Sequence, residues 1–166
     1  IVTHNEAREQ SELIRREPLL WVTSARHNIH MQNPLPLALG SPHCIWREAA
    51  MSALNDANRE FRMLYTSFSA TVVGSAVLAG LAVSVQPESA LRPGMRVLTE
   101  RDGFPELAQA EIGMLRGRRE RNTVSEALIS HIRQSLDAIY VPDYSVDAPQ
   151  VTLESIAWPS RGDKTL

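Results

Sequence analysis

The sequence predicts an α/β protein built on a parallel, doubly wound sheet. The main observation is the stretch 60–89, in which a strand pattern, a helix pattern and a second strand pattern follow one another. Residues 61–66 are short and rich in aromatic and aliphatic side chains, as strands are. A helical repeat of small apolar residues follows, then a glycine, and then the apolar run 82–85. The two strands of such a βαβ unit are parallel, and strands that alternate with helices indicate a doubly wound sheet.

The elements of this sheet can be assigned in order. Four strands are expected, at residues 19–23, 37–39, 61–66 and 82–85. For the first helix, Ser41 can be the N-cap and Pro42 the first helical residue, where a missing N–H costs nothing. Asn58 is its expected end. Ser67 or Ser69 can cap the second helix, and Gly80 can end it with a positive φ.

The rest of the chain carries weaker signals. Residues 1–3 predict the tail of a strand that enters a polar turn, and residues 13–16 a further short strand. Short strands are also expected at 96–99 and 110–116, and a helix at 123–139. Beyond Tyr140 the composition turns to Pro, Asp, Ser and Thr, which predicts a poorly ordered tail.

Composition excludes several classes of protein. The 166 residues are 43% hydrophobic and 22% charged, which is typical of a soluble globular domain, and the net charge of −2 gives no reason to expect nucleic-acid binding by this chain itself. The one cysteine, Cys44, cannot form a disulfide within the chain. No apolar run approaches the ~20 residues that span a bilayer, and no signal peptide is visible. The chain opens at Ile1 without a methionine, so we expect a piece of a longer protein.

Two hydroxyl-bearing turns are the candidate binding site. Ser41 and Pro42 follow one predicted strand, and Thr66 and Ser67 follow another. In a parallel sheet both turns lie at the same edge, where open α/β sheets bind ligands and where helix N-termini offer free N–H donors. Thr3, also at a strand end, could face the same crevice. The alternative is that these serines only cap helices, which is their commonest role.

The signals for catalysis and metal binding are weak. Cys44 follows His43, but neighbouring residues on a helix point in different directions, and a lone cysteine is more often a small buried hydrophobe. The histidines at positions 4, 27, 30 and 43 have no metal-ligand spacing, and no phosphate-binding glycine motif is present. Four arginines between 116 and 121 form either a solvated loop or a phosphate-contacting patch. We therefore expect no catalytic residue, no metal and no cofactor.

An ordered set of motifs carries a family resemblance. These are IVTHNE at the start, REPLLWVTSARHNIH, LPLALGSPHCIWREAA with the βαβ stretch behind it, MRVL, and the returning EIGMLRG with its final helix. In this order they resemble the effector-binding domain of LysR-type transcriptional regulators, most closely the LrhA-like branch. The resemblance covers about residues 1–137.

The resemblance implies two Rossmann-like subdomains of the periplasmic-binding-protein type 2, with a small effector bound between them. One subdomain would be complete and the second partial. The implied divisions are a crossover strand and hinge at 1–14, subdomain II at 15–86, the returning crossover with the C-terminal half of subdomain I at 87–139, and the tail at 140–166. The positions that match effector contacts in the family are Thr3, Ser41, Pro42, Thr66 and Ser67.

The resemblance also implies partners. DNA would be bound only by an N-terminal helix-turn-helix domain absent from this chain, and the regulator would be a cytoplasmic homodimer or homotetramer without a membrane partner. Three alternatives remain open: a periplasmic-type solute-binding protein, an enzyme that uses Cys44, and a dimerisation module that uses Trp46 and its alanine-rich helix.

Overall fold

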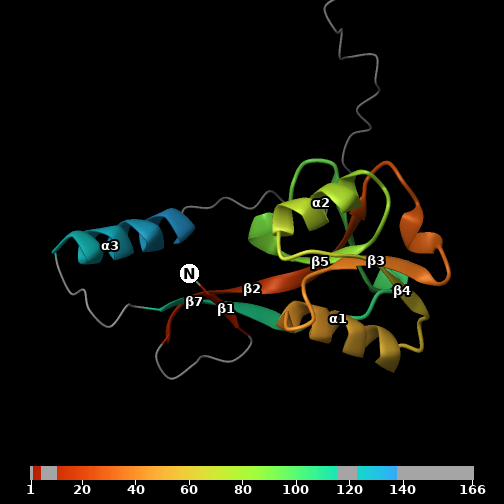
Figure 1. The fold of residues 1–166 in the computed structure, drawn as a ribbon, viewed down its shortest axis with the longest axis horizontal. Helices are drawn as coiled ribbons and strands as arrows, with labels where there is room; N and C mark the ends of the chain where they lie inside the picture. The colour runs from red at the N-terminus through yellow and green to blue at the C-terminus, as the bar shows by residue number, and fades with distance from the viewer. Residues whose placement is uncertain (1, 5–10, 116–122, 138–166) are drawn as a thin grey trace, which may run out of the picture.

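The computed structural model of the chain describes residues 2–4, 11–115 and 123–137 (Figure 1). Within them the strands are β1 (Val2–His4), β2 (Ser11–Ser24), β3 (Leu35–Leu39), β4 (Phe61–Thr66), β5 (Ser84–Pro87), β6 (Met95–Leu98) and β7 (Gln109–Leu115). The helices are α1 (Ile45–Asp56), α2 (Ala70–Leu78) and α3 (Thr123–Asp137), with short 3₁₀ helices η1 (Ile29–Met31), η2 (Glu88–Ala90) and η3 (Glu100–Asp102). The expected tail and the arginine-rich stretch lie outside the described residues.

The two strands of the predicted βαβ unit run parallel, and β3 lies between them. β3 and β4 pair in parallel, and a parallel bridge joins Leu37 of β3 to Val83, just before β5. The amide of Ala38 donates to the Val83 carbonyl at 2.9 Å, and the amide of Val83 donates to the Pro36 carbonyl at 2.9 Å. β4 and the segment that enters β5 therefore run in the same direction on the two sides of β3.

The long strand β2 is antiparallel to its neighbours, so the prediction that residues 19–23 join a parallel sheet is wrong. β2 pairs antiparallel with β5, β6 and β7. A parallel connection needs a crossover of a dozen or more residues, usually with a helix. Residues 25–34, between β2 and β3, hold only the short η1. The expected separate strand at 13–16 is likewise part of β2, with an irregular register between Leu13 and Arg15.

Helices cover both faces of this sheet, as a doubly wound fold requires (Figure 1). Leu37 lies in one buried cluster with Leu54 of α1. The next residue, Ala38, lies in a different cluster with Val73 of α2. Successive strand residues point to opposite faces, so α1 and α2 pack on opposite sides. Apolar burial on both faces is what stabilises this arrangement.

The two sheet helices end as predicted, but α1 does not begin as predicted. Asn58 follows α1 with a φ of +50°, and Gly80 follows α2 with a φ of +70°. Cys44 is the N-cap of α1, so Ser41 is not the cap and Pro42 is not the first helical residue. Residues 40–44 instead form a turn of their own, in which the Cys44 amide donates to the Ser41 carbonyl at 2.9 Å.

The absence of a side chain at Gly40 explains this turn. A Cβ added to Gly40 would lie 2.7 Å from the Cys44 sulfur atom, so the turn closes only because residue 40 has no side chain. Ser41 and Pro42, which were predicted to begin the helix, therefore belong to this turn, and the helix begins at Ile45.

Candidate functional site

Two turns meet at the carboxyl ends of β3 and β4. The strands are in register at their last residues, because Leu39 lies opposite Thr66. The Ser67 amide donates to the Leu39 carbonyl at 3.2 Å and extends the pairing by one residue. Both turns therefore leave the sheet at the same edge. We call residues 40–42 and 66–67 together the rim.

Arg47 joins the two turns. It lies in the first turn of α1, and its Nη1 donates to the Gly40 carbonyl at 3.2 Å and to the Thr66 hydroxyl oxygen at 3.2 Å. Sequence reasoning missed this residue. The available signal was its position, because helix side chains lean toward the helix N-terminus and a long side chain there reaches the strand ends.

The rim is accessible and carries polar groups. Pro42 and Thr66 are exposed, and Ser41 and Ser67 are half-buried. The Ser67 hydroxyl accepts a hydrogen bond from the Ser69 amide at 3.1 Å, which shapes the turn that leads into α2. The side chains at the N-caps of α1 and α2 make no capping hydrogen bond. Ser69 is the N-cap residue of α2, as predicted, but its hydroxyl accepts no capping hydrogen bond, and Ser41 is not an N-cap.

An apolar side chain borders the rim. Phe68 directly follows Ser67 and is 94% exposed. A ligand that covered this ring would remove apolar surface from water, which is favourable. The rim thus offers hydroxyls, with the Arg47 guanidinium and the Phe68 ring beside it.

Thr3 belongs to another strand pair. Its backbone lies in β1, opposite Ile112 of β7, whereas Ser41, Pro42, Thr66 and Ser67 follow β3 and β4. The structure therefore brings four of the five predicted residues to one edge and places Thr3 in a different part of the sheet system.

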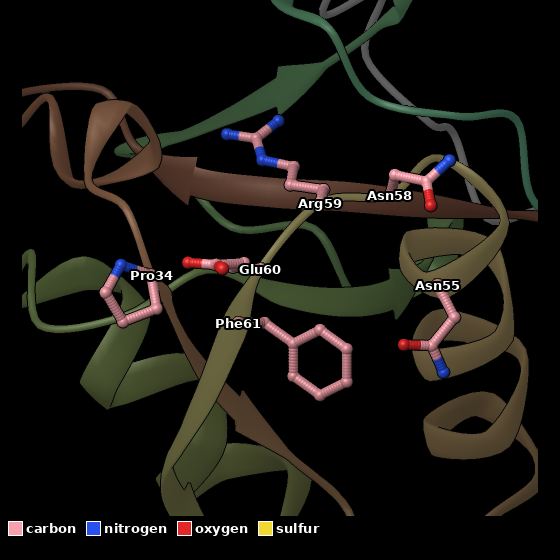
Figure 2. A pocket seen from close by; sticks show the side chains of 6 residues that line it. All are labelled: Pro34, Asn55, Asn58, Arg59, Glu60 and Phe61. Atoms are coloured by element: carbon pink, nitrogen blue, oxygen red, sulfur yellow. The ribbon is translucent and has the colours of Figure 1, made fainter.

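A surface pocket lies at the opposite end of the same strands. It has a volume of about 530 Å³ and is lined by Pro34, Asn55, Asn58, Arg59, Glu60 and Phe61. Figure 2 shows the Phe61 ring and Asn55 on the side of α1, with Arg59 pointing away from the ring. The Arg59 guanidinium donates to the His30 carbonyl at 2.6 Å and lies 4.0 Å from the centre of the Phe104 ring. The Arg59 guanidinium is therefore held by contacts with His30 and Phe104.

A second polar cluster surrounds His30, which is buried although it lies in the connection between β2 and β3. Its Nε2 lies 2.9 Å from Nη2 of Arg96, and Arg96 forms an ion pair with Asp102 at 3.0 Å. Burial and the Arg96 charge lower the pKa of His30. Burial opposes ionisation of Asp102, but the Thr99 amide and Arg96 together lower its pKa.

The catalytic and metal alternatives gain no support. Cys44 is a free, partly buried thiol packed against Gly40, and no hydrogen bond of the described residues links it to His43. Among the described residues, no group of three or more His, Cys, Asp or Glu side chains could hold a metal ion. None of the described helices is both long enough and apolar enough to cross a membrane.

Two curated relatives of this chain are both transcriptional regulators. The chain is 30% identical over 125 residues to the HTH-type transcriptional regulator DgdR of Burkholderia cepacia, an alignment that covers 75% of this chain and 42% of DgdR. It is 26% identical over 142 residues to the HTH-type transcriptional regulator PecT of Dickeya dadantii (strain 3937), covering 86% of this chain and 45% of PecT. The chain thus spans less than half the length of these two relatives.

Solved structures support the fold. The apo regulatory domain of HypT from Salmonella typhimurium matches with a TM-score of 0.57 at 18% identity, over 82% of this chain and 71% of that one. The regulatory domain of CcmR from Synechocystis PCC6803, solved in complex with 2-PG, matches with a TM-score of 0.51 at 15% identity, over 82% of this chain and 73% of that one.

The family match decides between a regulator domain and a solute-binding protein. Residues 1–137 match the LysR substrate binding domain, the same range over which the motifs resembled it. Membership of the LrhA-like branch and the subdomain boundaries stay predictions. The regulator interpretation is favoured over the periplasmic solute-binding one, because the relatives are transcriptional regulators. The chain belongs to the LysR substrate binding domain family.

Proposed function

We propose that the rim binds the small-molecule effector of a LysR-type transcriptional regulator, in a cleft between two subdomains. The contacts would come from Ser41, Pro42, Thr66 and Ser67, with Thr3 approaching from the crossover strand. The observation that carries the proposal is the Arg47 link, which places two polar turns side by side at the carboxyl ends of parallel strands. Ligands of open α/β sheets bind at such ends.

Structural relatives support a ligand with negative charge. One CcmR regulatory domain was solved in complex with 2-PG, one HypT regulatory domain was bromide-ion-bound, and one OxyR2 regulatory domain was sulfate-bound. These proteins share the fold with this chain at 15–18% identity. For the present chain they support a site that accepts small anions or polar molecules.

The mechanism would be a shift between conformations. An effector that binds one arrangement of the subdomains better than another shifts the equilibrium by the difference in binding free energy, typically about 1–3 kcal/mol. In the whole protein an N-terminal helix-turn-helix domain would bind DNA and respond to that shift. The relatives DgdR and PecT are named HTH-type regulators, which supports this arrangement.

The whole regulator would act in the cytoplasm as a homodimer or homotetramer, with neither catalytic activity nor a membrane partner. Leu64 and Tyr65 on β4 support self-association, because they are 45% and 44% exposed. Among the described strands, β4 pairs only with β3, so it also has an open edge.

A thermal-shift screen with matched variants tests the rim. We expect at least one compound from a panel of small organic acids, amides and aromatic metabolites to raise the melting temperature of the chain. Ser67→Trp should abolish that rise, because the indole fills the rim. The control is Ser52→Trp on the exposed face of α1, which should keep it. An equal response from the two variants, or no response from the unmodified chain, would contradict the proposal.

A further inference from the structure

The guanidinium of Arg47 is fixed by one of its nitrogen atoms. Nη1 carries two hydrogens, and it makes two hydrogen bonds, to the Gly40 carbonyl and to the Thr66 hydroxyl. These two bonds hold the position of the planar group. The side chain is half-buried, so part of it faces solvent.

The other edge of the same guanidinium is open. Nε and Nη2 carry three further hydrogens, and no described residue accepts a hydrogen bond from them. Two parallel N–H groups on one guanidinium edge match the two oxygens of a carboxylate. Arg47 therefore presents a preorganised donor pair at the end of the sheet.

The local charge is positive. The segments 40–44 and 66–69 contain no Asp or Glu. Glu48 follows Arg47 on α1 and is exposed, but no ion pair joins the two among the described residues. Arg47 therefore carries its charge beside the rim without an ion-pair partner among the described residues.

We propose that Arg47 determines the specificity of the rim and selects effectors that carry a carboxylate, which it holds in a bidentate contact through Nε and Nη2. This inference rests on the proposed function of the rim. It goes further in naming the chemical class of the effector and the residue that reads it. The body of the effector would extend toward the exposed ring of Phe68.

The test uses the smallest matched pair of probes, acetate and acetamide, which have nearly the same shape and differ in charge. The ¹H–¹⁵N spectrum of the 166-residue chain is recorded during each titration at constant ionic strength. Acetate should shift the Arg47 Nε–H signal and the rim amides in a saturable way, and acetamide should bind at least tenfold more weakly.

Variants separate the bidentate contact from simple charge. Arg47→Gln should weaken acetate binding at least tenfold, and Arg47→Lys should restore it only in part, because an ammonium is a point charge without the paired donors. Arg62→Gln is the matched control, since it removes an exposed cation from β4 and should leave acetate binding unchanged. Circular dichroism of each variant checks that the fold is kept.

Two outcomes would overturn the inference: no saturable acetate shift in the unmodified chain, or acetate binding retained by Arg47→Gln. Its failure is distinguishable from failure of the proposed site. A neutral compound whose thermal shift disappears in Ser67→Trp would keep the rim as the effector site while removing Arg47 as its selector.

Discussion

The contact between His30 and Arg96 requires the neutral form of the buried imidazole ring. The residue is 5% exposed, and Arg96 lies 2.9 Å from its Nε2. Arginine only donates, so Nε2 must accept and Nδ1 must carry the proton of the neutral ring. Nδ1 is buried without a partner among the described residues. A second proton would place an imidazolium beside a guanidinium, which is why burial and then Arg96 lower the pKa of His30.

This arrangement predicts loss of stability at mildly acidic pH. The ordinary pKa of histidine is 6.5 and the folded value is lower, so near pH 6 the unfolded chain binds a proton that the folded chain does not. The contribution of neutral His30 to the free energy of unfolding should therefore be fully present above about pH 7, and the free energy of unfolding should fall as the pH drops toward 5. Asp102 adds a separate loss only at lower pH, because its pKa is lowered from 3.8.

Urea denaturation at several pH values measures the effect. His30→Gln should flatten the slope between pH 7 and 5.5, and the control His131→Gln, which changes an exposed histidine of α3, should keep the slope of the unmodified chain. If the two variants give the same slope, His30 is not the residue responsible.

At the scale of elements, the end of α2 depends on a glycine for two separate reasons. Gly80 has a φ of +70°, which is strained for any residue with a Cβ, and an added Cβ would also overlap the His27 ring. Gly103 has a similar φ of +76°, but the nearest atom to an added Cβ is the Arg59 guanidinium at 3.9 Å. Comparing alanine variants of these two glycines therefore separates the cost of backbone strain from the cost of steric overlap.

Gly103→Ala should lower the free energy of unfolding by about 1–2 kcal/mol, the cost of a left-handed L-residue. Gly80→Ala should lower it by about 1 kcal/mol or more beyond that, because the His27 ring must move as well. Chemical denaturation measures both. Adding His27→Ala should recover part of the excess in Gly80→Ala, because the ring is removed while the Cβ of residue 27 stays 2.8 Å from the added Cβ, and it should have little effect in Gly103→Ala. Equal losses in the two glycine variants would show that overlap is unimportant.

Sequence reasoning succeeded where local chemistry decides the structure. Asn58 and Gly80 end their helices as predicted, because a positive φ favours these residue types. It failed at Ser41 and Pro42, where a strong local signal for a helix start was overridden by the packing of Cys44 on Gly40. The close approach of the Cys44 side chain to the backbone of Gly40, four residues earlier, is not visible in residue preferences.

At the scale of the whole molecule, β2 connects the two parts of the sheet system. Its first half pairs with β7 and its second half with β5 and β6 (Figure 1). At the change of partner lies Glu17, which is 1% exposed and accepts hydrogen bonds from the amide and the hydroxyl of Ser89, at 2.7 and 2.9 Å. A buried carboxylate with these partners fixes the chain where one part meets the other.

The long-range features were the hardest to predict. The alternation of strands and helices correctly indicated a doubly wound sheet, but the antiparallel direction of β2 depends on the short connection to β3 and on partners more than 60 residues away. For the site, four residues were correctly expected to share an edge, because parallel strands end together. Arg47 was missed because its role appears only when the turns after β3 and β4 are seen together.

The most direct test of the central claim is a ligand-binding map of the whole chain by NMR, recorded with a library of small acidic and neutral fragments. The rim is expected to hold the main binding site, so the largest amide shifts should fall together at Gly40, Ser41, Thr66 and Ser67. Shifts that gather around Pro34 and Phe61, at the pocket on the opposite end of the strands, or no site-specific shifts at all, would contradict it.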